Sequence, residues 1–342
     1  MAWTVVSFVE LQLWIEYVPQ YTTFLALYQF ANGFAGLMSW TIGLGGGFSE
    51  AYNNGKKKLT QYYLAQAWKY TGLIQFLLIS VLLVVVMILK PTLIALGLGQ
   101  YILSIPFIIP SIIREFQQPY NNFSSNVIIS TGHVNFLALC QLLEAGLAIL
   151  TWYIFIPVLN LPAKYGTTAI IWLIPCGEMV SICIKIIINY IYINRKIMKV
   201  KIPLYQTFLV PIISTTIIYT MGRLYVHFIF NPMNSSYGTI IALIPLAIIF
   251  ILIVPFFVYM PLTALIGAWD KGSIDILNKA TKISGLGKIF VLPMLRSVQW
   301  ASKKTDLAEK FAFDDSEALL EAKELMLLKN SNLEEEITIL AD

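Results

Sequence analysis

The sequence has few of the residues on which enzymes and metal proteins depend. It contains only two histidines and three cysteines among 342 residues. Cys140, Cys176 and Cys183 lie in apolar segments without the spacing of metal ligands, and we interpret them as small core residues. The sequence therefore predicts no catalytic cluster, no metal site and no cofactor, and the chain is not expected to be an enzyme.

Charge is also scarce over most of the chain, which argues against an ordinary water-soluble fold. Residues 1–268 contain 13 Lys and Arg and 6 Asp and Glu. Residues 269–342 contain 10 Lys and Arg and 13 Asp and Glu. The first part therefore carries a formal charge of +7 and the second part −3. We interpret residues 1–268 as a membrane domain and residues 269–342 as a cytoplasmic tail with an acidic end, and neither part indicates nucleic-acid binding.

Long apolar runs take the place of charge. Residues 70–89 hold no charged side chain, and neither do residues 238–268. A helix needs roughly 20 apolar residues to cross the hydrocarbon core of a bilayer, which is about 30 Å thick. The sequence predicts an all-α integral membrane protein with about eight transmembrane helices, at residues 2–18, 22–46, 68–89, 101–129, 133–157, 166–192, 204–228 and 238–266. For the first of these, an interfacial helix is the alternative.

Basic residues fall on alternate connections between these spans. Three lysines at 56–58 follow the second span and four basic residues at 195–201 follow the sixth. The connections of the opposite side have only Lys90 and Lys164. Because cytoplasmic loops are enriched in Lys and Arg, we predict a multi-pass protein of the cell membrane with both termini in the cytoplasm.

Two segments of the tail are predicted to be amphipathic helices. Residues 286–300 are apolar with two basic residues, which indicates a helix on the cytoplasmic membrane surface that Pro293 interrupts. Residues 316–329 have Ser316 as an N-cap and a partly amphipathic pattern of leucines.

Four segments, taken in order, resemble polysaccharide flippases of the MATE-like superfamily. Tyr28-Gln29-Phe30-Ala31 is similar to the Tyr-x-x-Ala pattern of one helix in that family. The segment from Ser49 to Tyr63 resembles its cytoplasmic loop, with a short amphipathic turn and a Gly-Lys-Lys-Lys sequence. Ser130-Thr131-Gly132-His133 and the stretch 156–169 resemble two further turns. The resemblance extends over about 250 residues.

This resemblance implies the last eight helices of a fourteen-helix flippase, namely the second bundle and two extra helices. Flippases of this kind move lipid-linked oligosaccharides from the cytoplasmic to the outer leaflet, through a polar and often cationic cavity between two bundles. The expected partners are the lipid bilayer and the lipid-linked oligosaccharide. Since the first bundle has no counterpart here, the sequence is a fragment, or a second half-transporter chain supplies the other half, or two copies pair.

Charged and polar residues inside the apolar spans are the candidates for substrate contact. A charge at a helix centre costs about 2.5–3.5 kcal/mol on insertion scales, so each such position needs a reason. Arg114 is the first candidate to hold a substrate anion, by planar bidentate contact. Pairing with Glu115, or a reach to the interface, is the alternative. The full set of expected substrate-binding residues is Arg114, Glu115, Lys185, Tyr28, Gln29 and Asn32.

Glu144 and Glu178 are the predicted proton- or cation-coupling residues. Glu144 has no basic neighbour in sequence, and the alternative for it is a neutral carboxyl hydrogen-bonded between helices. Glu178 and Lys185 lie seven residues apart on one helix face and could pair, or Lys185 could reach the interface. In the cytoplasmic loop, the residues expected to matter are Ser49, Glu50, Lys56, Lys57 and Lys58.

Three other functions stay open. A cation-coupled drug exporter of the same fold would depend on a carboxylate such as Glu144. A membrane-embedded glycosyltransferase or acyltransferase would need acidic or histidine side chains clustered on loops, where residues 1–268 offer only Glu50. A membrane scaffold without transport, whose tail recruits partners, is the third.

Overall fold

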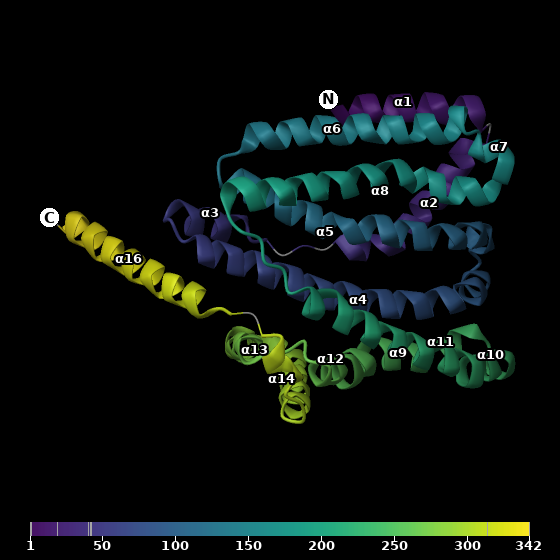
Figure 1. Ribbon diagram of the computed structural model, residues 1–342. Helices are drawn as coiled ribbons and strands as arrows, with labels where there is room; N and C mark the ends of the chain where they lie inside the picture. Colours follow the sequence, from purple (N-terminus) through teal and green to yellow (C-terminus); the bar gives the residue numbers. More distant parts are fainter. Residues whose placement is uncertain (1, 19, 40, 42, 313, 342) are drawn as a thin grey trace.

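The computed structural model describes residues 2–18, 20–39, 41, 43–312 and 314–341, and the regular structure in these ranges is helical, without a strand (Figure 1). The α-helices are α1 Ala2–Tyr17, α2 Tyr21–Ala35, α3 Gly45–Asn53, α4 Lys57–Ala95, α5 Ile108–Ser130, α6 Val134–Tyr153, α7 Leu161–Tyr165, α8 Thr167–Tyr192, α9 Val210–Tyr225, α10 Asn231–Tyr237, α11 Thr239–Ala247, α12 Met260–Leu265, α13 Lys271–Ile283, α14 Lys288–Ser302, α15 Leu307–Lys310 and α16 Ser316–Ala341.

Shorter turns extend or join these helices. Three are tight 3₁₀ turns, at Gly36–Ser39, Gly99–Phe107 and Gly285–Gly287. Wider π turns continue several helices, at Ile154–Val158, Ile193–Ile197, Tyr205–Leu209, Val226–Phe230 and Ile248–Tyr259.

Five helical stretches are long and apolar enough to cross a membrane. They are Lys57–Ala95, Val134–Val158, Thr167–Ile197, Tyr205–Tyr237 and Thr239–Leu265. Each contains or nearly coincides with a span expected from the sequence. The largest difference is α4, which begins at Lys57 rather than at residue 68. The segment 57–67 lacks Gly and Pro, and its Leu64 and Ala67 pack into a buried cluster, so the helix continues through it.

The other three expected spans do not belong to this group of five. The segment 2–18 forms α1, which has 16 residues. At 1.5 Å per residue this helix is about 24 Å long, shorter than the hydrocarbon core. The segment 22–46 divides into α2, of 15 residues, and a tight turn. The segment 101–129 begins as a 3₁₀ turn and continues as α5, whose second half is polar.

Helix α4 lies between two groups of helices (Figure 1). On one side α1, α2, α5, α6 and α8 pack around a core that includes Trp14, Trp152 and Phe107. On the other side α9, α11 and α12 pack around Phe250 and Tyr259. Because α4 contributes Leu82 and Leu89 to the first core and Leu73 and Val84 to the second, it joins the two groups.

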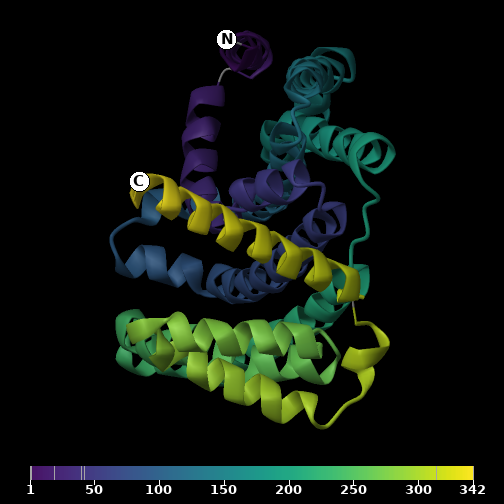
Figure 2. The ribbon, with the colours of Figure 1, turned by 90° about the vertical axis from the view of Figure 1, so that its left-hand side faces the viewer.

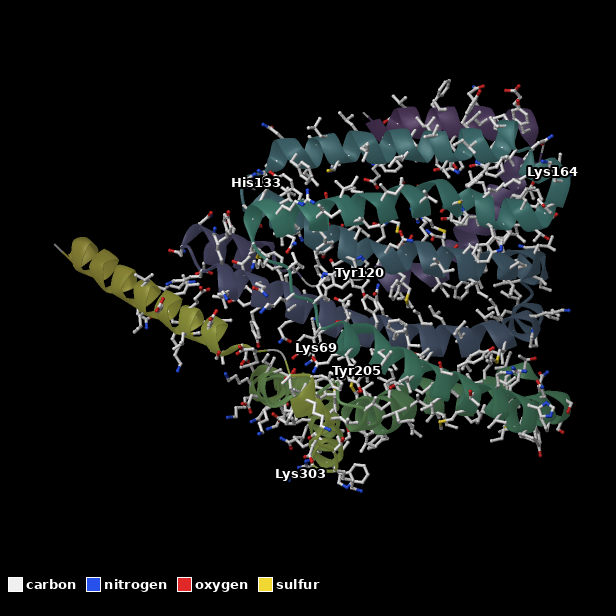
Figure 3. All side chains as sticks on the ribbon, in the orientation of Figure 1. Lys69, Tyr120, His133, Lys164, Tyr205 and Lys303 are labelled. Atoms are coloured by element: carbon white, nitrogen blue, oxygen red, sulfur yellow. The ribbon has the colours of Figure 1, made fainter. Side chains whose placement is uncertain are left out.

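Successive helices run in alternating directions, so the connections collect at two opposite ends. Figure 3 shows His133 at one end, between α5 and α6, and Lys164 at the other. The loop before α4, the α8–α9 connection and helices α13 and α16 lie at the end of His133 (Figure 1). The lysines at 56–58 and the basic residues at 195–201 therefore share one end of the molecule, as the predicted topology requires.

Helices α13 and α14 lie across this end of the bundle. Both are seen nearly end-on in Figure 1, where α4 and α6 run lengthwise. After a turn of 90° they run lengthwise in Figure 2, where α1 and α6 are nearly end-on. The predicted surface helix at 286–300 is thus α14, and α13 is an additional helix of the same orientation. The prediction that Pro293 interrupts it is wrong, because α14 continues through Pro293.

Gly177 of α8 brings α8 and α6 into close approach. A Cβ at Gly177 would overlap the indole ring of Trp152, and the Trp152 Nε1–H donates to the Leu173 carbonyl at 3.2 Å. We expect Gly177→Ala to lower the free energy of unfolding by about 1–3 kcal/mol, because the fully buried ring must shift. Denaturant titration of the detergent-solubilised protein measures this. The matched control Gly146→Ala, which meets no atom within 4 Å, should not destabilise, and an equal loss in both variants would contradict the prediction.

Candidate functional site

Arg114 is the centre of a charged group inside the first set of helices. It lies on α5 at the start of a polar stripe, with Gln117, Gln118, Asn121 and Asn122 following at helical spacing. This stripe faces α6 and α8, because all of its residues except Gln117 line one cavity together with Glu144 of α6 and Lys185 of α8. Arg114 Nη1 binds the carboxylate of Glu115, and Arg114 Nε binds the carboxylate of Glu178 on α8.

A second ion pair lies further along α8. Lys185 Nζ donates to Glu144 Oε2 of α6 at 2.7 Å, and each side chain is only 5% exposed. Glu178, Ser181 and Lys185 share one face of α8 at helical spacing, so α8 contributes a carboxylate to one pair and a cation to the other.

Helix α2 supplies uncharged polar groups beside Arg114. Tyr28, Gln29 and Asn32 lie on one face at helical spacing, and this face borders a cavity that Arg114 also lines. Glu10 of α1 is connected to α2 by a hydrogen bond, which the hydroxyl of Tyr21, the first residue of α2, donates to Glu10 Oε1 at 3.0 Å.

These residues line two adjoining cavities. The larger, of about 370 Å³, is bounded by Arg114, Gln118, Asn121, Glu144, Glu178 and Lys185. The smaller, of about 200 Å³, is bounded by Glu10, Tyr28, Gln29, Asn32, Arg114 and Glu178. Arg114 and Glu178 border both, so their ion pair separates the two cavities. We call the whole set the polar interior site.

The structure brings together the expected substrate-binding and coupling residues but pairs some of them differently. Glu144 was expected without a basic partner and is instead paired with Lys185. Lys185 is bonded to Glu144 rather than to Glu178, and its burial excludes a reach to the interface. The sequence could not predict the Glu144–Lys185 pair, because the two residues are 41 positions apart and the contact depends on α6 lying beside α8.

The expected loop residues lie apart from this site, at the end of the bundle, where α16 binds to them. Lys56 pairs with Glu324, Lys58 with Glu317, and Glu50 with Lys329 at 3.0 Å. The remaining two have local contacts: Ser49 Oγ accepts from Asn53, and Lys57 Nζ lies 5.9 Å from the Tyr52 ring centroid. Exposed pairs of this kind are individually weak and screened by salt.

A third buried ion pair was missed at the sequence level. Lys69 Nζ of α4 donates to Asp270 Oδ2 at 2.8 Å and to Ser273 Oγ at 2.6 Å, and Lys69 is 1% exposed. Figure 3 shows Lys69 close to Tyr205, where α4, α9 and α13 meet. Asp270 also caps α13, because its Oδ1 accepts from the Ser273 N–H at 2.8 Å.

The environment of Asp270 favours its charged form. Burial alone would raise the pKa of this carboxyl, but the Lys69 ammonium and the hydrogen bonds from Ser273 outweigh it and hold the pKa below its usual range. Two sequence signals could have found the pair: Asp270-Lys271-Gly272-Ser273 is typical of a helix N-terminus, and Lys69 stands at the edge of an apolar run.

Comparisons with models of protein families, with curated proteins and with solved structures give no match for this chain. The likeness to polysaccharide flippases therefore rests on the four sequence segments that resemble them.

The chemistry of the polar interior site is that of opposed charges and uncharged polar side chains. Within the described residues there is no group of three His, Cys, Asp or Glu side chains that could hold a metal ion. What the site offers are two cations that are each held by carboxylates, and polar side chains beside them. An incoming anion competes with the carboxylates for Arg114 and Lys185, and an incoming cation competes with Arg114 and Lys185 for the carboxylates.

Proposed function

We propose that this chain is a transporter of the polysaccharide-flippase type, which moves a lipid-linked oligosaccharide across the cell membrane by alternating access. The observation that carries the proposal is Arg114, held between Glu115 and Glu178 on the border of two cavities. Placing charged side chains inside a membrane costs free energy. Such side chains therefore mark substrate and ion pathways in membrane proteins.

The chemistry of such a cargo suits the two cavities. The guanidinium of Arg114 can bind a pyrophosphate with two parallel hydrogen bonds, after leaving one of its carboxylates. Lys185 lines the larger cavity and adds a second cation. The polar face of α2, with Tyr28, Gln29 and Asn32, offers donors and acceptors to sugar hydroxyls, while the lipid chain stays in the bilayer.

When the cations of the site exchange their carboxylate partners for the cargo, the movement of the cargo can be coupled to that of a proton or a cation. When Arg114 or Lys185 turns to the cargo, Glu178 or Glu144 is left without its cation in an environment of low dielectric constant. A carboxylate in that position binds a proton or a metal cation rather than remaining charged and alone. Release of the cargo restores the ion pair and expels the proton or cation, so the two movements are linked.

A cation-coupled exporter of cationic compounds is the second candidate, and one observation favours it. The two cavities are lined by the carboxylates Glu10, Glu144 and Glu178, and Glu115 binds Arg114 beside them, so four carboxylates stand against the two cations Arg114 and Lys185. With all groups ionised its charge is −2, which attracts cations.

Two features support eight membrane helices with both ends in the cytoplasm: five helices have the required length and hydropathy, and the basic connections share one end. Helices α1, α2 and α5 pack beside these five, and the bilayer would have to become thinner around α1 and α2, which are shorter than its hydrocarbon core. A cavity between two bundles then needs a second bundle, from a second copy or from another half-transporter chain.

The proposal is tested in liposomes that contain a lipid-linked oligosaccharide. An external glycosidase removes the sugars that reach the outside, and light scattering of the solubilised protein gives the number of copies in each particle. We expect Arg114→Ala to lower the transport rate at least tenfold and Arg114→Lys to restore part of it. The control Arg223→Ala, at an exposed arginine of α9 outside the site, should keep the wild-type rate.

Two results would contradict the proposal. One is transport by the Arg114→Ala variant at the wild-type rate. The other is the absence of oligosaccharide transport together with extrusion of a cationic dye that stops in Glu144→Gln, which would establish the exporter instead. A monomer without a partner chain and without either activity would leave the membrane scaffold as the function.

A further inference from the structure

Helix α14 has two unlike faces. Leu295, Val298 and Ala301 are buried, at 4%, 0% and 0% exposed, because this face packs against α12 and α13. Ile289 and Trp300 are exposed, at 72% and 56%. An exposed tryptophan on a helix that also carries basic residues is typical of helices that lie in the interface of a membrane.

An apolar groove runs between the outer side of α14 and the end of the last long helix. It has a volume of about 440 Å³ and is lined by Phe257, Pro261, Pro293, Arg296, Ser297 and Trp300. Phe257 is 62% exposed on the stretch Thr239–Leu265, which is apolar enough to cross a membrane. The groove is therefore open toward the surface that lipid chains would cover.

The charged side chains around this groove are mainly basic. Residues 271–304 contain seven Lys and Arg and one Asp. Residues 305–342 contain three Lys and eleven Asp and Glu. Among the described residues, neither Arg296 nor Lys303 nor Lys304 forms an ion pair. Lys304 Nζ lies 3.9 Å from the centroid of the Trp300 ring, at the groove. Figure 3 shows Lys303 at the outer edge of α14.

The orientation of α14 agrees with this charge distribution. The helix lies crosswise to α6 at the end of the bundle (Figures 1 and 2). If the long helices cross the membrane, α14 lies parallel to its surface, at the end to which the basic connections belong. Arg296 and Lys304 are then at the depth of the lipid head groups, with the groove beside the acyl chains.

We propose that α14 and the end of the last long helix form a binding site for an anionic phospholipid. One acyl chain lies in the groove between Phe257 and Trp300, and the phosphate binds Arg296 and Lys304. This site is separate from the polar interior site, and its occupant holds α14 against the membrane rather than being transported. The single acidic residue in the segment 271–304 leaves the positive charge of these side chains available to the head group.

The site is tested with the full chain in a mild detergent. Tryptophan fluorescence follows thermal unfolding while phosphatidylglycerol, phosphatidylcholine or inorganic phosphate is titrated. We expect phosphatidylglycerol to raise the midpoint saturably, at a few lipids per protein, and the other two to have no such effect. The double variant Arg296→Gln/Lys304→Gln should weaken the apparent affinity for phosphatidylglycerol at least tenfold.

Two further variants separate the parts of the site. Lys90→Gln/Lys164→Gln removes the same charge from the opposite end and should bind phosphatidylglycerol like the wild type. Ser297→Trp fills the groove without changing charge and should also weaken binding, with an unchanged midpoint in the absence of lipid. Equal shifts by phosphatidylglycerol and phosphatidylcholine, an equal shift by inorganic phosphate, or wild-type affinity in Arg296→Gln/Lys304→Gln would overturn the proposal.

Discussion

Replacing Lys185 by methionine is expected to lower the free energy of unfolding by about 3–5 kcal/mol. The methionine has nearly the volume of lysine, but it leaves the Glu144 carboxylate in a position where only 5% of the side chain is exposed. The loss is thus the cost of leaving the Glu144 carboxyl buried without its cation, either charged or protonated at neutral pH, rather than the cost of lost packing. Denaturant titration of the detergent-solubilised protein at neutral pH measures it.

A double variant and a control decide whether charge is the cause. Lys185→Met/Glu144→Leu removes the whole pair and should recover most of the lost stability, because an apolar pair of similar volume has no charge to bury. The exposed Lys164→Met should change the free energy of unfolding by no more than about 0.5 kcal/mol. If the double variant is as unstable as Lys185→Met, the charge is not the cause.

Replacing Lys69 by methionine is expected to have a similar cost, about 3–5 kcal/mol, but to act at the joint between α4 and α13. Lys69 and Asp270 are 201 positions apart, and their side chains are 1% and 9% exposed. Without Lys69 the Asp270 carboxylate is buried alone, so α13 and α14 should separate from the bundle before the long helices unfold. Limited proteolysis between α12 and α14 reports this separation.

The same joint should depend on pH, with a sign that follows from Asp270. Its pKa is lower in the folded chain than the ordinary value of about 3.9. The stabilisation by Lys69 is therefore complete above that ordinary pKa and is lost as the pH falls through the folded pKa below it. Cleavage of the wild type should increase only in that acidic range. Lys271→Met, at the exposed lysine that follows Asp270 in the sequence, should leave the dependence of cleavage on pH unchanged.

The sequence predicted the long helices well, because their signal is local. The runs at 133–157, 166–192 and 238–266 agree with the structure to within a few residues, since apolar length alone specifies such helices. The sequence does not predict the division of the segment 22–46 into α2 and a tight turn, because glycines like those in this segment also occur within continuous membrane helices.

Most members of the polar interior site and the Arg114–Glu115 pair, one of the two alternatives for Arg114, could also be predicted, but the ion pairs between helices could not. Arg114, Glu144 and Lys185 were found because a charge inside an apolar run must face the interior or a partner. Which carboxylate each cation meets depends on the rotation and neighbours of three helices, and no single segment contains that information. For Lys69 the sequence offers local signals, its place at the edge of an apolar run and the helix N-terminus at Asp270, but the contact between them depends on α13 lying beside α4.

The length of α4 determines how far the charged groups of the tail lie from a bilayer that residues 68–89 cross. With 39 residues, α4 extends over about 58 Å, nearly twice the thickness of the hydrocarbon core. If residues 68–89 lie in that core, residues 57–67 project about 16 Å beyond it. Lys56 and Lys58 then stand roughly one Debye length, about 8 Å, outside the head groups, where the pull of anionic lipid is largely screened. On this placement, the acidic helix α16 binds these lysines beyond the head groups, and the basic helices α13 and α14 lie at the lipid surface. Helix α4 would then keep the two parts of the tail at different distances from the membrane.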